Sequence, residues 1–77
     1  MLLGQVVGNV TATRKQAALT GQKFLVIRTE GGHTIVAADL MGAGPDEQVI
    51  IATGRAARIA MGKDDMPVDA AVVGIVD

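Results

Sequence analysis

Hydrophobic and polar residues alternate along the first part of the chain. Between residues 2 and 13 the even positions are Leu, Gly, Val, Gly, Val and Ala, whereas the odd positions are mostly polar. A period of two residues is typical of a β-strand with one buried face, and we expect the even positions to face the core. Gly4 and Gly8 suit a sharply bent strand, or one that another backbone approaches closely.

Four further segments are typical of strands. Residues 24–27 (FLVI) form a continuous apolar run, which predicts a strand covered on both faces. Residues 34–38 return after a hairpin connection at residues 30–33. The last two predicted strands are residues 48–53 (QVIIAT), which follow a glycine-rich loop, and residues 71–76.

The only segment rich in helix formers is residues 55–61 (RAARIAM). Thr53 or Gly54 is a candidate to cap its start, and Gly62 is a candidate for the left-handed residue after its end. Five short strands and one short helix predict a mainly β fold in a single domain over residues 1–77. Closing the sheet into a small five-stranded OB-like β-barrel removes its exposed edges.

The composition limits the classes of function. The chain has no cysteine and one aromatic residue, yet 49% of its residues are hydrophobic. So small a domain is marginal alone, and without disulfides or metals such domains often gain stability by oligomerising. The net charge of -1 argues against electrostatic binding to nucleic acid or to a membrane surface. We see no signal peptide and no apolar run of membrane-spanning length, and we expect a cytoplasmic protein.

No set of residues points to catalysis. Serine and cysteine are absent, and the single histidine, His33, lies in the predicted hairpin connection, where we interpret it as a solvated turn residue. Asp64 and Asp65 are adjacent, so their side chains diverge. Residues 42–44 (GAG) begin like a dinucleotide-binding motif, but Glu47 stands where the third glycine belongs. We therefore expect no catalytic residue, no metal site and no cofactor.

Four segments taken together carry a family resemblance. They are LLGQVVGNVTATRK, KFLVIR, VAADLMGAGPDEQVIIATGRAAR and PVDAAVVGIVD, and they cover nearly the whole chain. In this combination they resemble the EutN/CcmL family, the vertex proteins of bacterial microcompartments, which include carboxysomes. The resemblance implies an OB-like barrel that forms a homo-pentamer at the fivefold corners of a polyhedral shell. It also implies hexameric shell proteins as neighbours, a place in the cytoplasmic microcompartment shell, and no catalysis.

The positions that match family motifs define candidate interface residues. Thr13, Arg14 and Lys15 match a TRK motif at the end of the first strand. The resemblance implies that they contact a neighbouring subunit or the facet proteins, and a charged strand end in water is the alternative.

The loop motif GAG is matched by Gly42, Ala43 and Gly44. It is either a tight turn that needs glycine torsions, or a backbone close to a subunit interface or a central opening. If only glycine tolerates its torsions, Gly44→Val would disturb the loop. Asp39 and Asp69 are candidates to accept from an arginine across an interface, and the pairs stay open among Arg14, Arg55 and Arg58.

Two differences from the family limit this comparison. The hairpin at residues 30–33 is shorter than in many members, and many members run on beyond the position of Asp77, so we assign no role that such extensions carry. A second hypothesis is an OB-like binding module for single-stranded nucleic acid or a peptide. Binding of single strands needs aromatic platforms and a basic groove, whereas this chain has only Phe24 and scattered charges.

Overall fold

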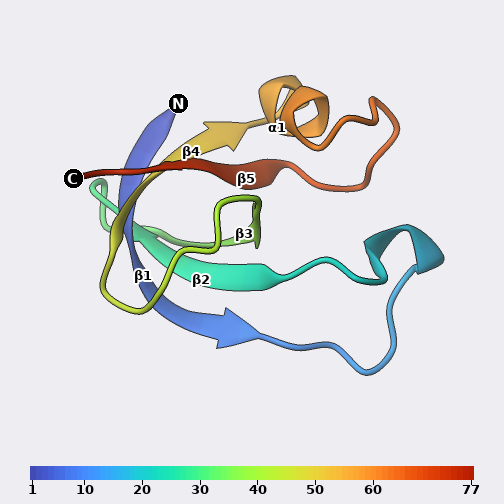
Figure 1. Cartoon of the computed structure of the whole chain (residues 1–77), viewed down its shortest axis with the longest axis horizontal. Helices are drawn as coiled ribbons and strands as arrows, with labels where there is room; N and C mark the ends of the chain where they lie inside the picture. Colours follow the sequence, from blue (N-terminus) through green and yellow to red (C-terminus); the bar gives the residue numbers. More distant parts are fainter.

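The computed structural model describes residues 1–77 (Figure 1). In chain order the elements are β1 (Leu2–Val10), the 3₁₀ turn η1 (Ala17–Leu19), β2 (Phe24–Thr29), β3 (Thr34–Asp39), β4 (Gln48–Thr53), α1 (Arg55–Ala60) and β5 (Ala70–Ile75). The strands form a closed barrel in the order β1-β2-β3-β5-β4, in which only β3 and β5 pair in parallel. The predicted fold class, a mainly β, five-stranded OB-like barrel with one short helix, is confirmed.

β1 carries a β-bulge that exchanges its two faces. The register between β1 and β2 shifts between Val6 and Gly8, so Val7 is the extra residue. Before the bulge the even positions Gly4 and Val6 are buried, but after it the odd position Asn9 lies opposite the buried Leu25. The prediction that even positions face inward is therefore wrong beyond Val6, because one extra residue moves every following side chain to the other face.

Gly4 lies where β1 and β2 approach each other closely. A Cβ built on Gly4 would stand 2.5 Å from Ile27 Cγ2 and 2.9 Å from the backbone oxygen of Arg28. A Cβ on Gly8 would meet only Val26 Cβ, at 3.9 Å, which is ordinary van der Waals contact. Of the two explanations predicted for these glycines, close approach of a second backbone holds at Gly4, whereas Gly8 directly follows the bulge, which bends the strand.

The interior of the barrel holds the main hydrophobic core. It consists of aliphatic side chains from all five strands and from the loop before β4, namely Val6, Leu25, Ile27, Ala37, Ala43, Val49, Ile51, Ala70 and Val72. Full burial of one valine or isoleucine side chain stabilises the fold by about 1.5–3 kcal/mol. A core without aromatic residues therefore depends on many medium-sized side chains packed from every strand.

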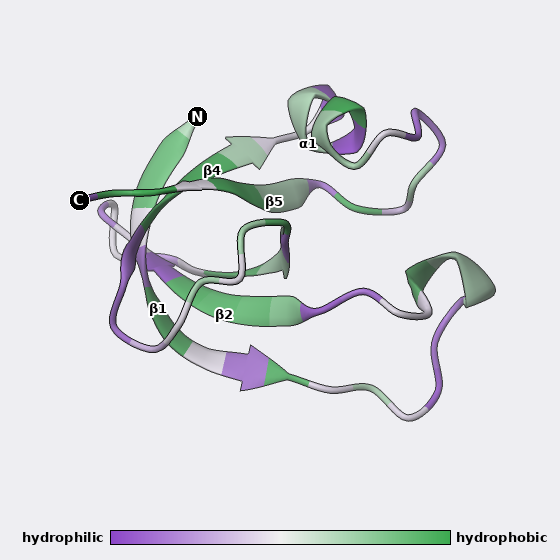
Figure 2. Cartoon of the chain, in the orientation of Figure 1, coloured by the Kyte–Doolittle hydropathy of each residue, from purple (hydrophilic) through white to green (hydrophobic).

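A second apolar cluster packs α1 and the segment that follows it against β3 and β5. Figure 2 shows α1 and this segment beside β5, with hydrophobic residues in both. The buried members of the cluster are Ala38, Ala57, Met66, Val68 and Ala71. β5 is thus covered on both faces, with Val72 inside the barrel and Ala71 in the outer cluster. The double cover predicted for residues 24–27 is only partly right, because Leu25 and Ile27 are buried while Phe24 and Val26 are half-buried.

Glycines bound the short helix α1. Gly54 is its N-cap residue, with φ 61° and ψ -135°, and no side chain caps the helix, so Thr53 does not serve as a cap. Gly62 follows the helix with φ 82°, which confirms the predicted left-handed residue. α1 has six residues, and no helix of the structure is long and apolar enough to cross a membrane.

Candidate functional site

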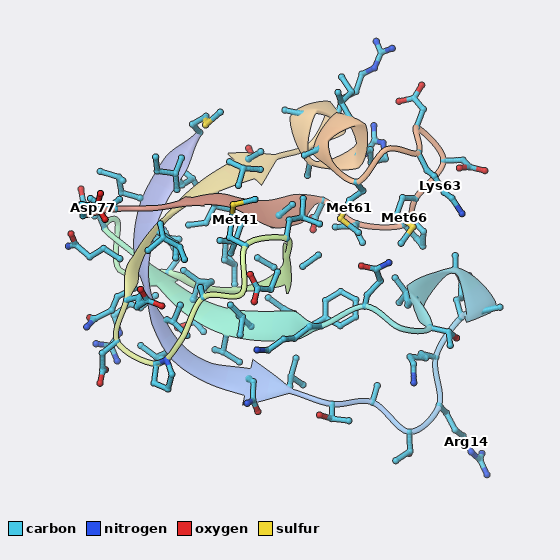
Figure 3. The ribbon with its side chains drawn as sticks, in the orientation of Figure 1. Arg14, Met41, Met61, Lys63, Met66 and Asp77 are labelled. Atoms are coloured by element: carbon cyan, nitrogen blue, oxygen red, sulfur yellow. The ribbon has the colours of Figure 1, made fainter.

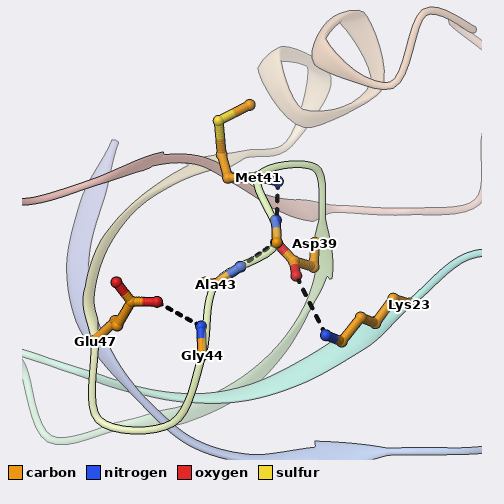
Figure 4. A network of polar contacts seen from close by, with 7 residues as sticks. Lys23, Asp39, Met41, Ala43, Gly44 and Glu47 are labelled. Carbon is orange, nitrogen blue, oxygen red and sulfur yellow. Dashed lines mark hydrogen bonds and ion pairs between the residues drawn. The ribbon is translucent and has the colours of Figure 1, made fainter.

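β3 ends at Asp39, and the carboxylate of this residue organises the loop that follows (Figure 4). Asp39 Oδ1 accepts hydrogen bonds from the backbone N–H groups of Met41 and Gly42, both at 3.0 Å, and of Ala43, at 3.3 Å. The Asp39 side chain is 0% exposed. Because hydrogen bonds to an ionised acceptor are the strong ones, this one carboxylate holds the loop from within.

The second carboxylate oxygen of Asp39 faces a lysine. Asp39 Oδ2 is buried without a hydrogen-bond partner, and Lys23 Nζ lies 3.9 Å from it. The same two residues are joined by a backbone hydrogen bond of 2.8 Å, from Asp39 N–H to Lys23 C=O. A buried charge needs such compensation, and here the three N–H groups and the ammonium group share it. The sequence did not mark Lys23, since nothing around it shows that it meets a carboxylate.

The second half of the loop is tied to β1. Gly44 N–H donates to Glu47 Oε1 at 2.6 Å, and Ala43 is buried in the barrel core. Asp46 N–H donates to the Val6 carbonyl at 2.9 Å, and Val6 N–H donates to the Glu47 carbonyl at 3.0 Å. The GAG loop is therefore a fixed part of the barrel.

Gly42 is the glycine of this loop whose torsion excludes most other residues. Its φ is 74°, whereas Gly44 is not among the residues with positive φ. A Cβ on Gly44 would meet only Glu47 Oε1, at 3.3 Å, the far end of a flexible side chain. The prediction that glycine torsions shape the loop is right for Gly42, and its extension to Gly44 is wrong.

Thr13, Arg14 and Lys15 lie outside the sheet, because β1 ends at Val10 instead of at residue 13. They are exposed in the connection between β1 and β2, which projects from the barrel and contains the unpredicted turn η1 (Figure 3). Lys15 Nζ donates to the carbonyl of Ala12 at 2.9 Å. Figure 3 places Arg14 far from Met41, so the structure does not bring the TRK motif to the GAG loop.

Asp69 lies exposed at the surface just before β5. Its carboxylate forms no ion pair within the chain, since the two ion pairs present are Lys23–Asp39 and Arg55–Asp64. Of its candidate partners, Arg55 contacts Asp64 in its own chain, with 3.5 Å between Nε and Oδ1. Asp69 therefore keeps its carboxylate available for a cation outside the chain.

The barrel leaves many large apolar side chains exposed. They are Met1, Leu2, Leu3, Val7, Val10, Val36, Met41, Ile59 and Val76. Four of these residues belong to β1. Four exposed apolar side chains in one strand of a small domain are typical of a surface that associates.

The groups considered for catalysis do not form a common site. His33 is exposed in the hairpin between β2 and β3, and its backbone N–H donates to Thr29 Oγ1 at 3.3 Å. Asp64 and Asp65 are exposed in the turn after α1. No three His, Cys, Asp or Glu side chains come together. The surface offers exposed aliphatic side chains and charged groups without ion-pair partners, and both occur in protein–protein interfaces.

These features define a small closed β-barrel domain with a loop fixed by a buried carboxylate. The profile of the family described as "Ethanolamine utilisation protein EutN/carboxysome" matches residues 1–77, the full length of the chain. The chain belongs to the EutN/CcmL family. The resemblance seen in the sequence is thereby confirmed.

Two relatives show how similar this chain is to named family members. "Carboxysome shell vertex protein CcmL" of Thermosynechococcus vestitus is 47% identical over 83 residues, covering 100% of this chain and 84% of that protein. "Bacterial microcompartment shell vertex protein GrpN" of Rhodospirillum rubrum is 48% identical over 83 residues, covering 100% of this chain and 93% of that protein. Both alignments are longer than this chain, so both relatives contain residues without a counterpart here.

Solved structures agree with the fold. "Ethanolamine utilization protein, EutN" superposes with a TM-score of 0.93 at 34% identity, covering 100% of this chain and 86% of that chain. "GrpN pentameric microcompartment shell protein from Rhodospirillum rubrum" superposes with a TM-score of 0.89 at 43% identity, covering 100% of this chain and 94% of that chain.

Proposed function

We propose that this chain is a structural shell protein that forms a pentamer at the fivefold vertices of a bacterial microcompartment, either carboxysome-like or a metabolosome. The observation that carries the proposal is the match over residues 1–77 to a family whose relatives are named shell vertex proteins. A solved relative that is described as pentameric supports the number of copies in the ring.

The surface of the barrel supports assembly on physical grounds. A ring of identical subunits joins two unlike surfaces of each copy, head to tail. This chain has exposed aliphatic side chains on the barrel wall, and it has charged groups, Asp69 and Arg14 among them, without an ion-pair partner of their own. Burying such surface between copies adds stability that a 77-residue core does not supply alone.

The proposal includes partners and a location. The ring contacts hexameric shell proteins in the microcompartment shell, inside the cytoplasm. The projecting residues Thr13, Arg14 and Lys15 face a neighbouring subunit or these hexamers, and the loop of Gly42, Ala43 and Gly44 lies near the subunit interface or the central opening. The protein acts without catalysis or a cofactor, and it binds neither nucleic acid nor a membrane.

Co-expression with hexameric shell proteins tests this function. We expect closed polyhedral shells in electron micrographs when this chain is present, and open or incomplete shells when it is omitted. We also expect the chain to co-purify with the shells. Shells that close equally well without the chain, or that exclude it, would contradict the proposal.

A charge reversal in the projecting connection tests the role of the TRK motif. Arg14→Glu places a negative charge on an exposed residue that has no ion-pair partner in its own chain. We expect this variant to enter shells less than the unchanged protein. Lys63→Glu, an equal reversal at another exposed and unpaired residue, is the matched control and should enter shells normally.

A further inference from the structure

A hollow opens where β1 and β2 separate. The two strands pair as far as Val10 and Phe24, and beyond this pair the chain continues into the two arms of the projecting connection (Figure 1). The hollow has a volume of about 360 Å³ and is lined by residues 9–12 and Lys15 of one arm and by residues 21–24 of the other. Sites for small ligands begin at about 300 Å³, so the hollow is large enough for a small metabolite.

The charged side chains that line this hollow are all positive. Lys15 and Lys23 both line it, whereas none of the eight acidic residues of the chain does. The chain as a whole has a net charge of -1, so the positive charge is a local feature of the connection. A concave site lined by charges of one sign attracts ligands of the opposite sign.

Both ammonium groups keep N–H donors for a ligand. Lys15 Nζ donates one hydrogen bond, of 2.9 Å, to the Ala12 carbonyl within its own arm. Lys23 Nζ lies 3.9 Å from Asp39 Oδ2, which is too far for a hydrogen bond. Because an ammonium group has three donors, most of those on the two lysines are unused. The Asp39 side chain is 0% exposed and does not line the hollow, so a ligand there meets Lys23 and not the carboxylate.

Neutral polar side chains form another part of the wall. Asn9, Thr11 and Gln22 line the hollow, and their side chains make no hydrogen bond within the chain. Amide and hydroxyl groups both donate and accept hydrogen bonds, so they suit the hydroxyl groups of a polar metabolite. The half-buried Phe24 gives the wall an apolar side.

We propose that this hollow binds a small phosphate monoester, with Lys15 and Lys23 on the phosphate group. Two ammonium groups match a dianion better than a carboxylate with its single charge, and a phosphate monoester carries a charge of about -1.5 to -2 at pH 7. Hydrogen bonds from an ammonium group to phosphate oxygens are charge-assisted and therefore strong. The site goes beyond the proposed function, which assigns no ligand to this chain. Arg14 takes no part in it, since its side chain points away from the barrel (Figure 3).

A nuclear magnetic resonance titration of the isotope-labelled protein, in the assembled form in which it is purified, tests the site. The probe is methyl phosphate, added at constant ionic strength because salt screens exposed charges. We expect saturable shifts of the amides of residues 9–12 and 21–24, and none in α1. Methyl sulfate, which has nearly the same shape but a single charge, should bind several-fold more weakly. Shifts spread over the whole chain, or equal binding of the two probes, would overturn the proposal.

A matched pair of lysine variants gives the second test. Lys15→Gln should raise the Kd for methyl phosphate about fivefold, the upper range for an exposed ion pair. Lys63→Gln, at an exposed lysine outside the hollow, should leave the Kd unchanged. Lys23→Gln should weaken binding as Lys15→Gln does, but it also removes the cation beside Asp39. If Lys23→Gln fails to fold, Lys15→Gln decides alone, and a Kd equal to that of Lys63→Gln would overturn the proposal.

Discussion

The carboxylate of Asp39 accepts a hydrogen bond of 3.0 Å from the backbone N–H of Gly42, and Gly42 adopts a φ of 74°. The left-handed torsion of Gly42 lets the turn direct three successive N–H groups at one oxygen, the Oδ1 atom of Asp39. The turn then brings Ala43 back into the barrel core. A loop of small residues is in this way tied both to the end of β3 and to the core.

Asp39→Ala should lower the free energy of unfolding by about 1–3 kcal/mol, because the loop N–H groups lose their acceptor. Asp39→Asn, which keeps a side-chain oxygen, should lower the free energy of unfolding by less than Asp39→Ala does. Chemical denaturation at one fixed protein concentration measures both effects, since assembly makes stability depend on concentration. Asp65→Ala, at an exposed aspartate, is the control, with an expected change within about 0.5 kcal/mol. Equal effects of Asp39→Ala and Asp65→Ala would contradict this account of the loop.

Gly42→Ala should destabilise the protein by about 1–2 kcal/mol, because alanine disfavours the left-handed region that Gly42 occupies. Gly44→Ala should change stability by less than about 0.5 kcal/mol, since its φ is not positive and only the end of Glu47 must move. The two variants lie two positions apart in one loop. Their denaturation curves distinguish the cost of an unfavourable backbone torsion from the cost of a steric contact. If Gly44→Ala proved the more damaging substitution, our assignment of the strained position would be wrong.

Gly4→Ala should lower the free energy of unfolding by about 1–3 kcal/mol, because the new Cβ would collide with the Arg28 backbone oxygen, which is fixed in the strand. Gly8→Ala lies in the same strand, meets only an ordinary contact and should be close to neutral. Thermal unfolding of both variants at matched concentration provides the comparison. A neutral Gly4→Ala would show that β1 and β2 are able to move apart at this point.

The sequence was a good guide to the strands and a poor guide to how they meet. Alternation and apolar runs mark all five strands, because a buried strand face needs apolar side chains at every second position. The bulge at Val7 was not predictable, since small apolar residues around it fit either face. β3 and β5 pair only at Ala38 and Asp39, and no local pattern encodes where the two strands separate.

Motifs in the sequence pointed to the candidate interface residues, but they did not show what each residue contacts. Asp39 proved to hold its own loop, because its partners Lys23 and Gly42 are set by the fold. Asp69 was found exposed and unpaired, as an interface residue would be in a single copy. The number of copies in a ring depends on the angle between two surfaces, which no residue pattern reports.

Single-stranded oligonucleotides should not bind to this protein at near-physiological salt. The only aromatic side chain, Phe24, packs against the outer apolar cluster, and the net charge is -1. Stacking platforms and a basic groove are the usual means of such binding. A fluorescence anisotropy titration over a range of salt concentrations measures it, with a known single-strand-binding protein as positive control. Binding that weakens as salt increases would favour the OB-like binding module over a shell protein.

The mass of the purified protein in solution tests the central claim most directly. Light scattering after size-exclusion chromatography, or native mass spectrometry, should report about five copies of the 7.9 kDa chain at micromolar concentration. A single species with the mass of one chain, 7.9 kDa, would contradict the account.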